Sequence, residues 1–129
     1  MGQLLLTIEE DNKVLLNQLL NIQYPIIQGA MANIATASFA ACVSNSGGLG
    51  IIATGSMDAN QTRIEIQKCK QLTTQPFGVN VMLMNPYASE IIDVIVEEGV
   101  HVVTTGAGNP GPYMAKLKEA GIKVFPVVP

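Results

Sequence analysis

Five short apolar runs, rich in Val and Ile, recur along this chain at almost equal intervals. They begin at residues 24, 49, 77, 101 and 123, so that successive starts are 25, 28, 24 and 22 residues apart. The runs cover residues 24–28, 49–53, 77–83, 101–105 and 123–128. Near-continuous hydrophobicity is typical of strands buried on both faces of a parallel sheet. Each interval has room for one strand and one helix, so the sequence predicts an α/β fold with right-handed crossovers.

Helix start and stop signals occupy the intervals. We expect Asn33 to cap a helix that ends at Gly47-Gly48, and Asp58 to cap a helix that continues to Leu72. The next two helices are expected to begin at Asn-Pro pairs, with a proline at the first helical position, and to end just before a glycine. These pairs are Asn85-Pro86 and Asn109-Pro110, and the glycines are Gly99 and Gly121.

Composition and cysteine spacing exclude several classes of protein. Hydrophobic residues are 48% and charged residues 13%, which excludes a disordered chain, and the formal net charge of −3 argues against a nucleic-acid partner. Cys42 and Cys69 form no CxxC pair and, with only His101 beside them, cannot supply a tetrahedral zinc site, so we expect reduced thiols. No secretory signal and no apolar stretch of about 20 residues is present, so we expect a cytoplasmic protein without a membrane partner.

Two architectures accommodate five strand–helix units. One is a doubly wound, flavodoxin-like sheet; the other is the first part of a TIM (β/α)8 barrel, which typically needs about 250 residues. A complete doubly wound domain should finish with a covering helix, whereas this sequence finishes on the apolar run 126–129. We therefore expect a partial TIM barrel with the first five parallel strands in residues 24–129. Residues 1–23 are expected to form a helical segment in which Leu15, Leu16, Leu19 and Leu20 cover the bottom of the sheet.

Candidate binding residues follow the carboxyl ends of the predicted strands, where parallel α/β proteins place their sites. Gly29, Ala30 and Met31 allow backbone to approach a flat ligand, although a tight turn followed by a core methionine explains them equally well. Residues 53–56 form a small polar loop that fits a phosphate, a sugar or an ordinary turn. Asn80 is an amide in an apolar strand, and it needs either a ligand or neighbouring backbone as its partner.

Residues 106–111 match GxGxxG, but they follow the fourth predicted strand, and no acidic residue ends the next strand. We interpret them as a loop of the binding face rather than as a dinucleotide fingerprint. His101 begins its strand, so we expect it at the opposite, structural face of the barrel.

Four segments together resemble the nitronate monooxygenase (2-nitropropane dioxygenase) superfamily, and within it the FMN-dependent enoyl-acyl carrier protein reductases II. They are Tyr-Pro-Ile-Ile-Gln-Gly-Ala-Met from 24, Ser-Gly-Gly-Leu-Gly-Ile-Ile from 46, Pro-Phe-Gly-Val-Asn-Val-Met-Leu from 76 and Val-Val-Thr-Thr-Gly-Ala-Gly-Asn-Pro from 102. The resemblance spans residues 22–129 and implies the N-terminal half of an FMN-binding TIM barrel. It implies hydride transfer from NAD(P)H through FMN to an enoyl thioester carried by acyl carrier protein, or, in the nitronate monooxygenases, the use of flavin and oxygen.

The resemblance also implies site residues. Gly29, Ala30 and Met31 would pack under the isoalloxazine, Asn80 would bond the flavin, and Thr105 and Gly106 would lie near the pocket; Ala30 stands where the family more often has Gly. The family's catalytic histidine and main FMN-phosphate loops belong to segments beyond residue 129, so no catalytic residue is assigned. The isolated chain is therefore expected to be inactive, to retain FMN poorly, and to form a homo-oligomer or associate with the missing C-terminal half.

Overall fold

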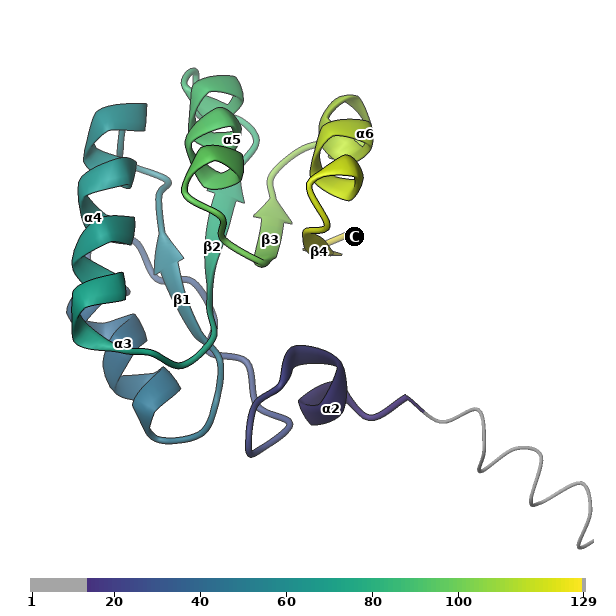
Figure 1. Cartoon of the computed structure of the whole chain (residues 1–129). Helices are drawn as coiled ribbons and strands as arrows, with labels where there is room; N and C mark the ends of the chain where they lie inside the picture. Colours follow the sequence, from purple (N-terminus) through teal and green to yellow (C-terminus); the bar gives the residue numbers. More distant parts are fainter. Residues whose placement is uncertain (1–13, 129) are drawn as a thin grey trace, which may run out of the picture.

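The computed structural model describes residues 14–128, and its centre is a parallel sheet of four strands (Figure 1). The strands are β1 (Gly50–Ala53), β2 (Phe77–Met82), β3 (Val102–Gly106) and β4 (Lys123–Pro126), in that spatial order. In the register of the sheet, Ala53 lies beside Asn80, Asn80 beside Thr104, and Thr104 beside Phe125. The α/β prediction is confirmed, and the architecture is a partial (β/α)8 barrel.

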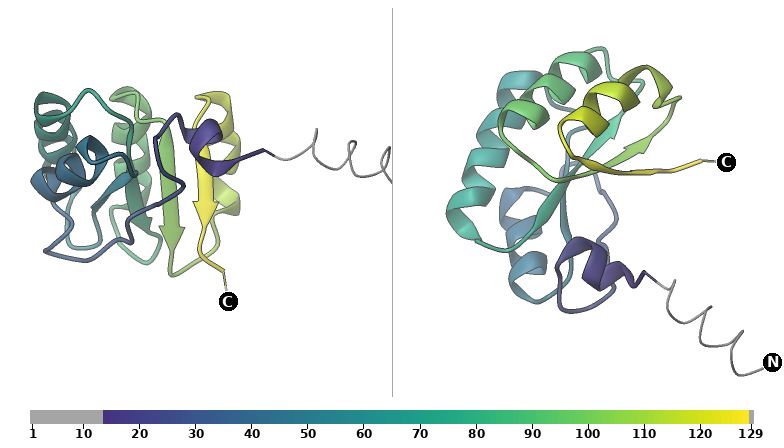
Figure 2. Two further views of the ribbon diagram at one scale, coloured as in Figure 1. Left: turned by 90° about the horizontal axis from the view of Figure 1, so that it is seen from below. Right: turned by 45° about the vertical axis from the view of Figure 1, so that its right-hand side comes forward.

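Four helices cover the outer face of the sheet, and a fifth lies on the other side (Figure 2). The outer helices are α3 (Ala37–Asn45), α4 (Ala59–Leu72), α5 (Ala88–Glu97) and α6 (Gly111–Glu119), and the inner one is α2 (Leu16–Leu20). Leu20 is buried and Leu16 packs beside it, whereas Leu15 and Leu19 are exposed. No helix between Val14 and Val128 has the length and apolarity that crossing a membrane requires.

Alternate strand residues point to two different apolar layers, as the two-residue period of a strand requires. Ile52, Val79, Val81 and Val103 point outward and pack with the helices, most closely with a group of fully buried side chains. That group contains Ile66, Ile91, Ile95 and Leu117. On the inner face, Leu49, Ile51 and Val102 pack with Leu20, so α2 covers the amino-terminal part of this face. The carboxyl-terminal part of the inner face carries polar residues instead, among them Asn80 and Thr104.

The prediction of a first strand over residues 24–28 is wrong. Only Ile27 forms a β-bridge, a parallel one with Leu49, and no regular strand follows. The backbone leaves the sheet after Gln28, whose side chain takes over the hydrogen bonds to Ile51. Pairing to β1 resumes only when the Ala35 carbonyl accepts from Ala53 N–H. The sheet therefore has four regular strands and one bridging residue, not five strands.

The start of α3 also differs from its prediction, whereas that of α4 agrees. Asn33 is not a cap: it has a left-handed backbone (φ +64), and Thr36 instead caps α3 by accepting from Phe39 N–H. The helix ends at Asn45, next to the expected glycines. Asp58 caps α4 in a full capping box with Gln61, as predicted.

Neither Asn-Pro pair caps its helix in the predicted way. Asn85 and Asn109 accept from the backbone N–H groups of Tyr87 and Gly111, respectively, in turns that precede α5 and α6. The two prolines therefore lie before the first helical residue rather than on it. The helix ends agree with the prediction, because Gly99 and Gly121 both follow with a left-handed backbone.

The α3 helix packs on β1 with almost no side chain between them. A Cβ atom added at Gly50 would lie 1.9 Å from the carbonyl oxygen of Ala40, so only glycine fits there. The Gly50 N–H donates to the Ser44 hydroxyl at 3.0 Å. On the other side, the Glu65 carboxylate of α4 accepts from Ala37 N–H at 2.7 Å, which ties α3 to α4.

Ion pairs join α4 to the end of α5. Arg63 contacts Glu97 at 2.5 Å and Glu98 at 2.9 Å, and Lys70 contacts Glu98 at 3.0 Å. The hydrogen bond from Lys70, followed by those from Arg63 and Gln67, holds the pKa of Glu98 below its ordinary value of 4.5. Glu97 is the main cause of the raised pKa of Arg63.

Candidate functional site

Four loops meet at the carboxyl edge of the sheet, and direct hydrogen bonds connect them. The hydroxyl of Ser56, in the loop after β1, donates to the side-chain oxygen of Asn33 at 3.4 Å. After β2, Leu83 N–H donates to the Gly106 carbonyl at the end of β3 at 2.9 Å. The loops that follow Gln28, β1, β2 and β3 thus form one continuous surface, at the edge where the sequence predicted the binding residues.

Asn80 lies at the centre of this edge on the inner face of the sheet. Its side-chain oxygen accepts from the Thr104 hydroxyl at 2.8 Å, and its main-chain carbonyl accepts from the Thr54 hydroxyl at 2.7 Å. Thr54 is fully buried and Asn80 is half-buried. Within residues 14–128, the Asn80 amide NH₂ donates to no protein group. The Thr104 contact fixes the direction of the side-chain amide, the Thr54 contact anchors the main chain at Asn80, and the NH₂ group is left as a hydrogen-bond donor for a ligand.

Thr105 lies on the other face of the sheet from Asn80. It pairs in register with Val81, which points to the helices, and its side chain is buried. The threonine beside Asn80 is Thr104, one residue earlier. Because strand side chains alternate between faces, a one-residue difference decides which threonine reaches a ligand on the inner face. The sequence analysis did not single out Thr104, and it offered Thr54 only as part of the loop 53–56, because the hydrogen bonds of both residues to Asn80 could not be known from the sequence.

The glycines named from the sequence leave backbone accessible around Asn80. A Cβ atom added at Gly29 or at Gly106 would meet no atom within 4 Å. Met31, in the same loop as Gly29, is 39% exposed, and Met82 at the end of β2 is 41% exposed. The described site therefore combines one directed amide, two open stretches of backbone and two polarizable apolar side chains, which suits a flat aromatic ligand with polar edges.

Asn85 holds this edge together from behind. It is almost fully buried, and its amide NH₂ donates to the carbonyls of Thr54 at 3.2 Å and Met57 at 2.9 Å. Its side-chain oxygen accepts from Tyr87 N–H at 2.9 Å. Asn85 thus fastens the loop after β1 to the turn after β2 and keeps Thr54 in place below Asn80. The Asn-Pro pair in the sequence indicated a helix start and gave no sign of this role.

The glycine-rich loop after β3 has a packing explanation. Ala107 and Gly108 have positive φ angles of 53 and 153. A Cβ atom at Gly108 would lie 2.8 Å from the Cβ of Leu83, so this glycine lets the loop close onto the end of β2. The loop lies at the carboxyl edge of the sheet, and its part in binding stays a prediction.

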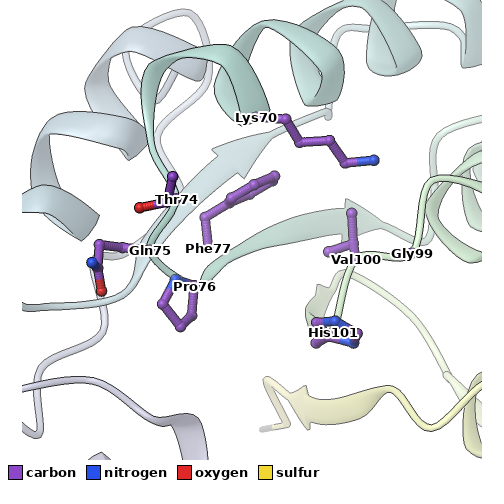
Figure 3. A pocket seen from close by; sticks show the side chains of 8 residues that line it. All are labelled: Lys70, Thr74, Gln75, Pro76, Phe77, Gly99, Val100 and His101. Atoms are coloured by element: carbon purple, nitrogen blue, oxygen red, sulfur yellow. The ribbon is translucent and has the colours of Figure 1, made fainter.

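His101 lies at the opposite edge, as predicted, where β3 begins. It lines a pocket of about 210 Å³ together with Lys70, Phe77 and Val100 (Figure 3). The Lys70 ammonium is occupied by the Glu98 side chain and its main-chain carbonyl. This pocket is separated from Asn80 by the length of the strands, so His101 is not part of the candidate site.

The residues that form the site are amides, hydroxyls, methionines and backbone. None of these groups exchanges a proton readily near neutral pH, so the chemistry of the described candidate site suits hydrogen bonding and packing rather than proton transfer. Among residues 14–128, no cluster of three His, Cys, Asp or Glu side chains is placed to hold a metal ion.

A partial (β/α)8 barrel with a candidate site at the carboxyl edge of its sheet has the arrangement of the TIM-barrel proteins, which carry their sites at that edge. The family model for nitronate monooxygenase matches residues 13–94, and the chain belongs to this family. The structure superposes on that of FabK from Thermotoga maritima over 90% of this chain, with 47% sequence identity and a TM-score of 0.87. It also superposes on nitroalkane oxidase from Streptomyces ansochromogenes, at 25% identity and a TM-score of 0.80 over 89% of this chain.

Two curated relatives show similar matches. The chain is 34% identical, over 88% of its length, to (3aS,4S,5R,7aS)-5-hydroxy-7a-methyl-1-oxo-octahydro-1H-indene-4-carboxyl-CoA dehydrogenase of Mycobacterium tuberculosis. It is 54% identical, over 53% of its length, to a probable nitronate monooxygenase of Staphylococcus haemolyticus. These matches cover 32% and 19% of the two relatives. The FabK and nitroalkane oxidase matches cover 37% and 42% of those chains, so this chain spans less than half of each protein it resembles.

Proposed function

We propose that this chain supplies the isoalloxazine-binding half of a flavin-dependent oxidoreductase of the enoyl-acyl carrier protein reductase II type. The observation that carries the proposal is the Asn80 amide, which Thr104 orients and whose NH₂ group donates to no protein group in the described chain, at the same edge of the sheet as the uncovered backbones of Gly29 and Gly106. A flavin ring has hydrogen-bond acceptors along one edge and broad apolar faces, and this arrangement matches both. The bound FMN would accept hydride from NAD(P)H and deliver it to the β-carbon of an enoyl thioester.

The residues of the candidate site have different parts in that proposal. Asn80 would donate to a ring acceptor, while Gly29 to Met31 would lie against one face of the ring, because glycine and alanine leave the backbone uncovered. Thr104 would act through Asn80 by orienting its side-chain amide, and Thr54 by holding the main chain at Asn80. The proton donor for the substrate and the groups that hold the FMN phosphate are assigned to no residue of this chain.

The reductase is favoured over a nitronate monooxygenase by the extent of similarity. Identity to FabK is 47% across 90% of this chain, whereas identity to nitroalkane oxidase is 25% across 89%. The monooxygenase remains the second candidate, because 68 residues are 54% identical to a probable nitronate monooxygenase. The two reactions share the flavin and differ in what reoxidises it.

We propose further that activity requires the remaining strand–helix units of the barrel. β4 is bonded on one side only among the described residues, and Met82, at the carboxyl end of β2, is 41% exposed. An unpaired strand edge next to partly exposed apolar side chains favours association. The partner would be a C-terminal barrel half; pairing with a second copy of this chain is the competing outcome.

The experiment mixes the chain with the C-terminal remainder of T. maritima FabK, expressed separately, and titrates FMN into the mixture. We expect a heterodimer by light scattering, saturable flavin binding, and NAD(P)H oxidation that depends on an enoyl thioester. Nitroalkane-dependent oxygen uptake instead would identify the monooxygenase. A homodimer with no affinity for the remainder would overturn the partner proposal.

Asn80→Ala tests the site itself. Because a ring acceptor would lose its buried partner, we expect FMN affinity to fall by about 1 to 3 kcal/mol in the mixture. Asn60→Ala, an exposed position on α4, is the matched control and should leave affinity unchanged. Equal affinities for Asn80→Ala and the unchanged chain would remove Asn80 from the site.

A further inference from the structure

The edge of β1 that faces residues 26–35 is bonded in an unusual way. Two ordinary rungs of a parallel ladder come first: Leu49 N–H donates to the Ile26 carbonyl at 2.9 Å, and Gln28 N–H donates to the Leu49 carbonyl at 3.0 Å. In a regular parallel ladder, Ile51 would then bond to the backbone of residues 28 and 30. Neither of these two bonds is formed by backbone here.

The Gln28 side chain forms both bonds instead. Its oxygen accepts from Ile51 N–H at 3.0 Å, and its amide nitrogen donates to the Ile51 carbonyl at 3.2 Å. A primary carboxamide presents an acceptor and a donor in one plane, as a peptide group does, so it can replace the backbone acceptor of residue 28 and the backbone donor of residue 30. Ile51 is fully buried, and without these bonds its polar backbone groups would lose their partners.

This substitution frees the backbone that follows. Residues 29–34 leave the sheet, and the ladder resumes when the Ala35 carbonyl accepts from Ala53 N–H at 2.9 Å. The Gln28 amide also donates to the Gly29 carbonyl at 2.9 Å, which fixes the first peptide of the departing loop. At the far end of the loop, Met31 accepts from Ala35 N–H at 2.8 Å. Both ends of the segment that carries Gly29 to Met31 are thereby anchored to the edge of β1.

We propose that Gln28 is a positioning residue, whose carboxamide replaces two rungs of the ladder and so sets the loop of Gly29 to Met31 at the height of Asn80. The functional consequence rests on the proposed function, in which this loop lies against the flavin ring. Gln28 itself is assigned no contact with flavin or substrate. Its effect on binding passes through the Gly29 carbonyl and through Ile51, which lies two residues before Ala53, the register neighbour of Asn80.

The proposal makes a prediction about single amide protons of the whole chain, with no flavin present. In Gln28→Ala, hydrogen exchange at Ile51 N–H should accelerate roughly 3- to 10-fold, as expected from losing one hydrogen bond of ordinary net strength. Exchange at Leu49 N–H, which donates to Ile26 backbone, should change much less. Gln23→Ala is the matched control, because the Gln23 side chain donates only to the neighbouring Tyr24 hydroxyl in the described chain.

Gln28→Glu separates the two halves of the carboxamide. An ionised carboxylate still accepts from Ile51 N–H but no longer donates to the carbonyls of Ile51 and Gly29. We therefore expect Ile51 N–H to stay protected in this variant while the loop loses its anchor. If Gln28→Ala fails to fold, shown by loss of Leu49 protection, the Gln28→Glu variant carries the test.

Flavin binding in the mixture with the FabK remainder supplies the functional readout. Both variants should weaken FMN binding several-fold and alter the visible absorption band of the bound flavin, because the loop contacts the ring; Gln23→Ala should do neither. Unchanged Ile51 exchange in Gln28→Ala, or unchanged flavin affinity and spectrum in both variants, would overturn the role of Gln28. Failure of the unchanged chain to bind FMN would overturn the proposed function, and the exchange at Ile51 would still decide whether Gln28 holds the edge of β1.

Discussion

Replacing Asn85 by alanine should destabilise the chain far more than replacing Asn109, although both asparagines precede a proline at a helix start. Asn85→Ala removes three close hydrogen bonds, of 3.2, 2.9 and 2.9 Å, and a longer one of 3.5 Å to the Gly55 carbonyl, from a side chain that is only 9% exposed. At about 1 kcal/mol for each bond, with a further penalty for carbonyls left buried, the free energy of unfolding should fall by roughly 2 to 4 kcal/mol. Asn109→Ala removes one bond of 2.9 Å from an exposed side chain and should lose roughly 1 kcal/mol or less.

Urea unfolding followed by circular dichroism measures both values on the whole chain. The midpoint should shift in Asn85→Ala, and the dependence on urea concentration should stay the same if the native state keeps its compactness. Two comparable losses, or a loss below about 1 kcal/mol in Asn85→Ala, would refute the assignment of Asn85 as the residue that fastens the loop after β1 to the turn after β2.

Two further predictions concern titratable groups. Contacts with Lys70 and then Arg63 lower the pKa of Glu98 below 4.5, so its stabilising contribution is complete above that pH and is lost as the pH falls through the lowered value. In thermal melts, Glu98→Gln should therefore reduce the loss of stability that acidification below pH 4.5 causes. Burial, and then the charge of Glu65, raises the pKa of Cys69 to about 11, whereas Cys42 is exposed. At pH 8 a thiol reagent should therefore label Cys42 rapidly and Cys69 only on unfolding; a fast phase that persists in Cys42→Ser would contradict this.

The strands that the sequence predicted well are those that pair with neighbouring strands and are covered by helices. The apolar runs predict β1 to β4 correctly, because each of these strands is bonded to its neighbours and packs against the outer helices. The run at 24–28 is just as apolar, yet the structure forms one bridge there, because a side chain replaces the backbone at Ile51. Hydrophobicity indicates burial; it does not tell whether backbone or a carboxamide supplies the bonds.

The structure gathers most of the candidate residues at the carboxyl edge of the sheet, as expected from the sequence, and adds side chains that the sequence did not connect with them. Position at a strand end identifies Asn80, Gly29 and Gly106, because carboxyl ends of parallel strands meet at one edge. Thr104 and Thr54 depend on which residues lie beside Asn80 in the register, and register is a property of several strands together. The role of Asn85 depends on loops 28 to 31 residues away in sequence, which no local pattern records.

The contact between Gly50 and Ala40 has a mechanical consequence. Glycine and alanine have no side-chain rotamers, so forming this contact costs little side-chain entropy compared with a contact between long side chains. For the same reason the contact is stiff, because at this point no side chain lies between the two backbones that could change rotamer to absorb a strain. We therefore expect α3 and β1 to respond to force as one stiff body. A displacement of the first turn of α3 should also move Ala35 and the loop of Gly29 to Met31, which precede it in the chain.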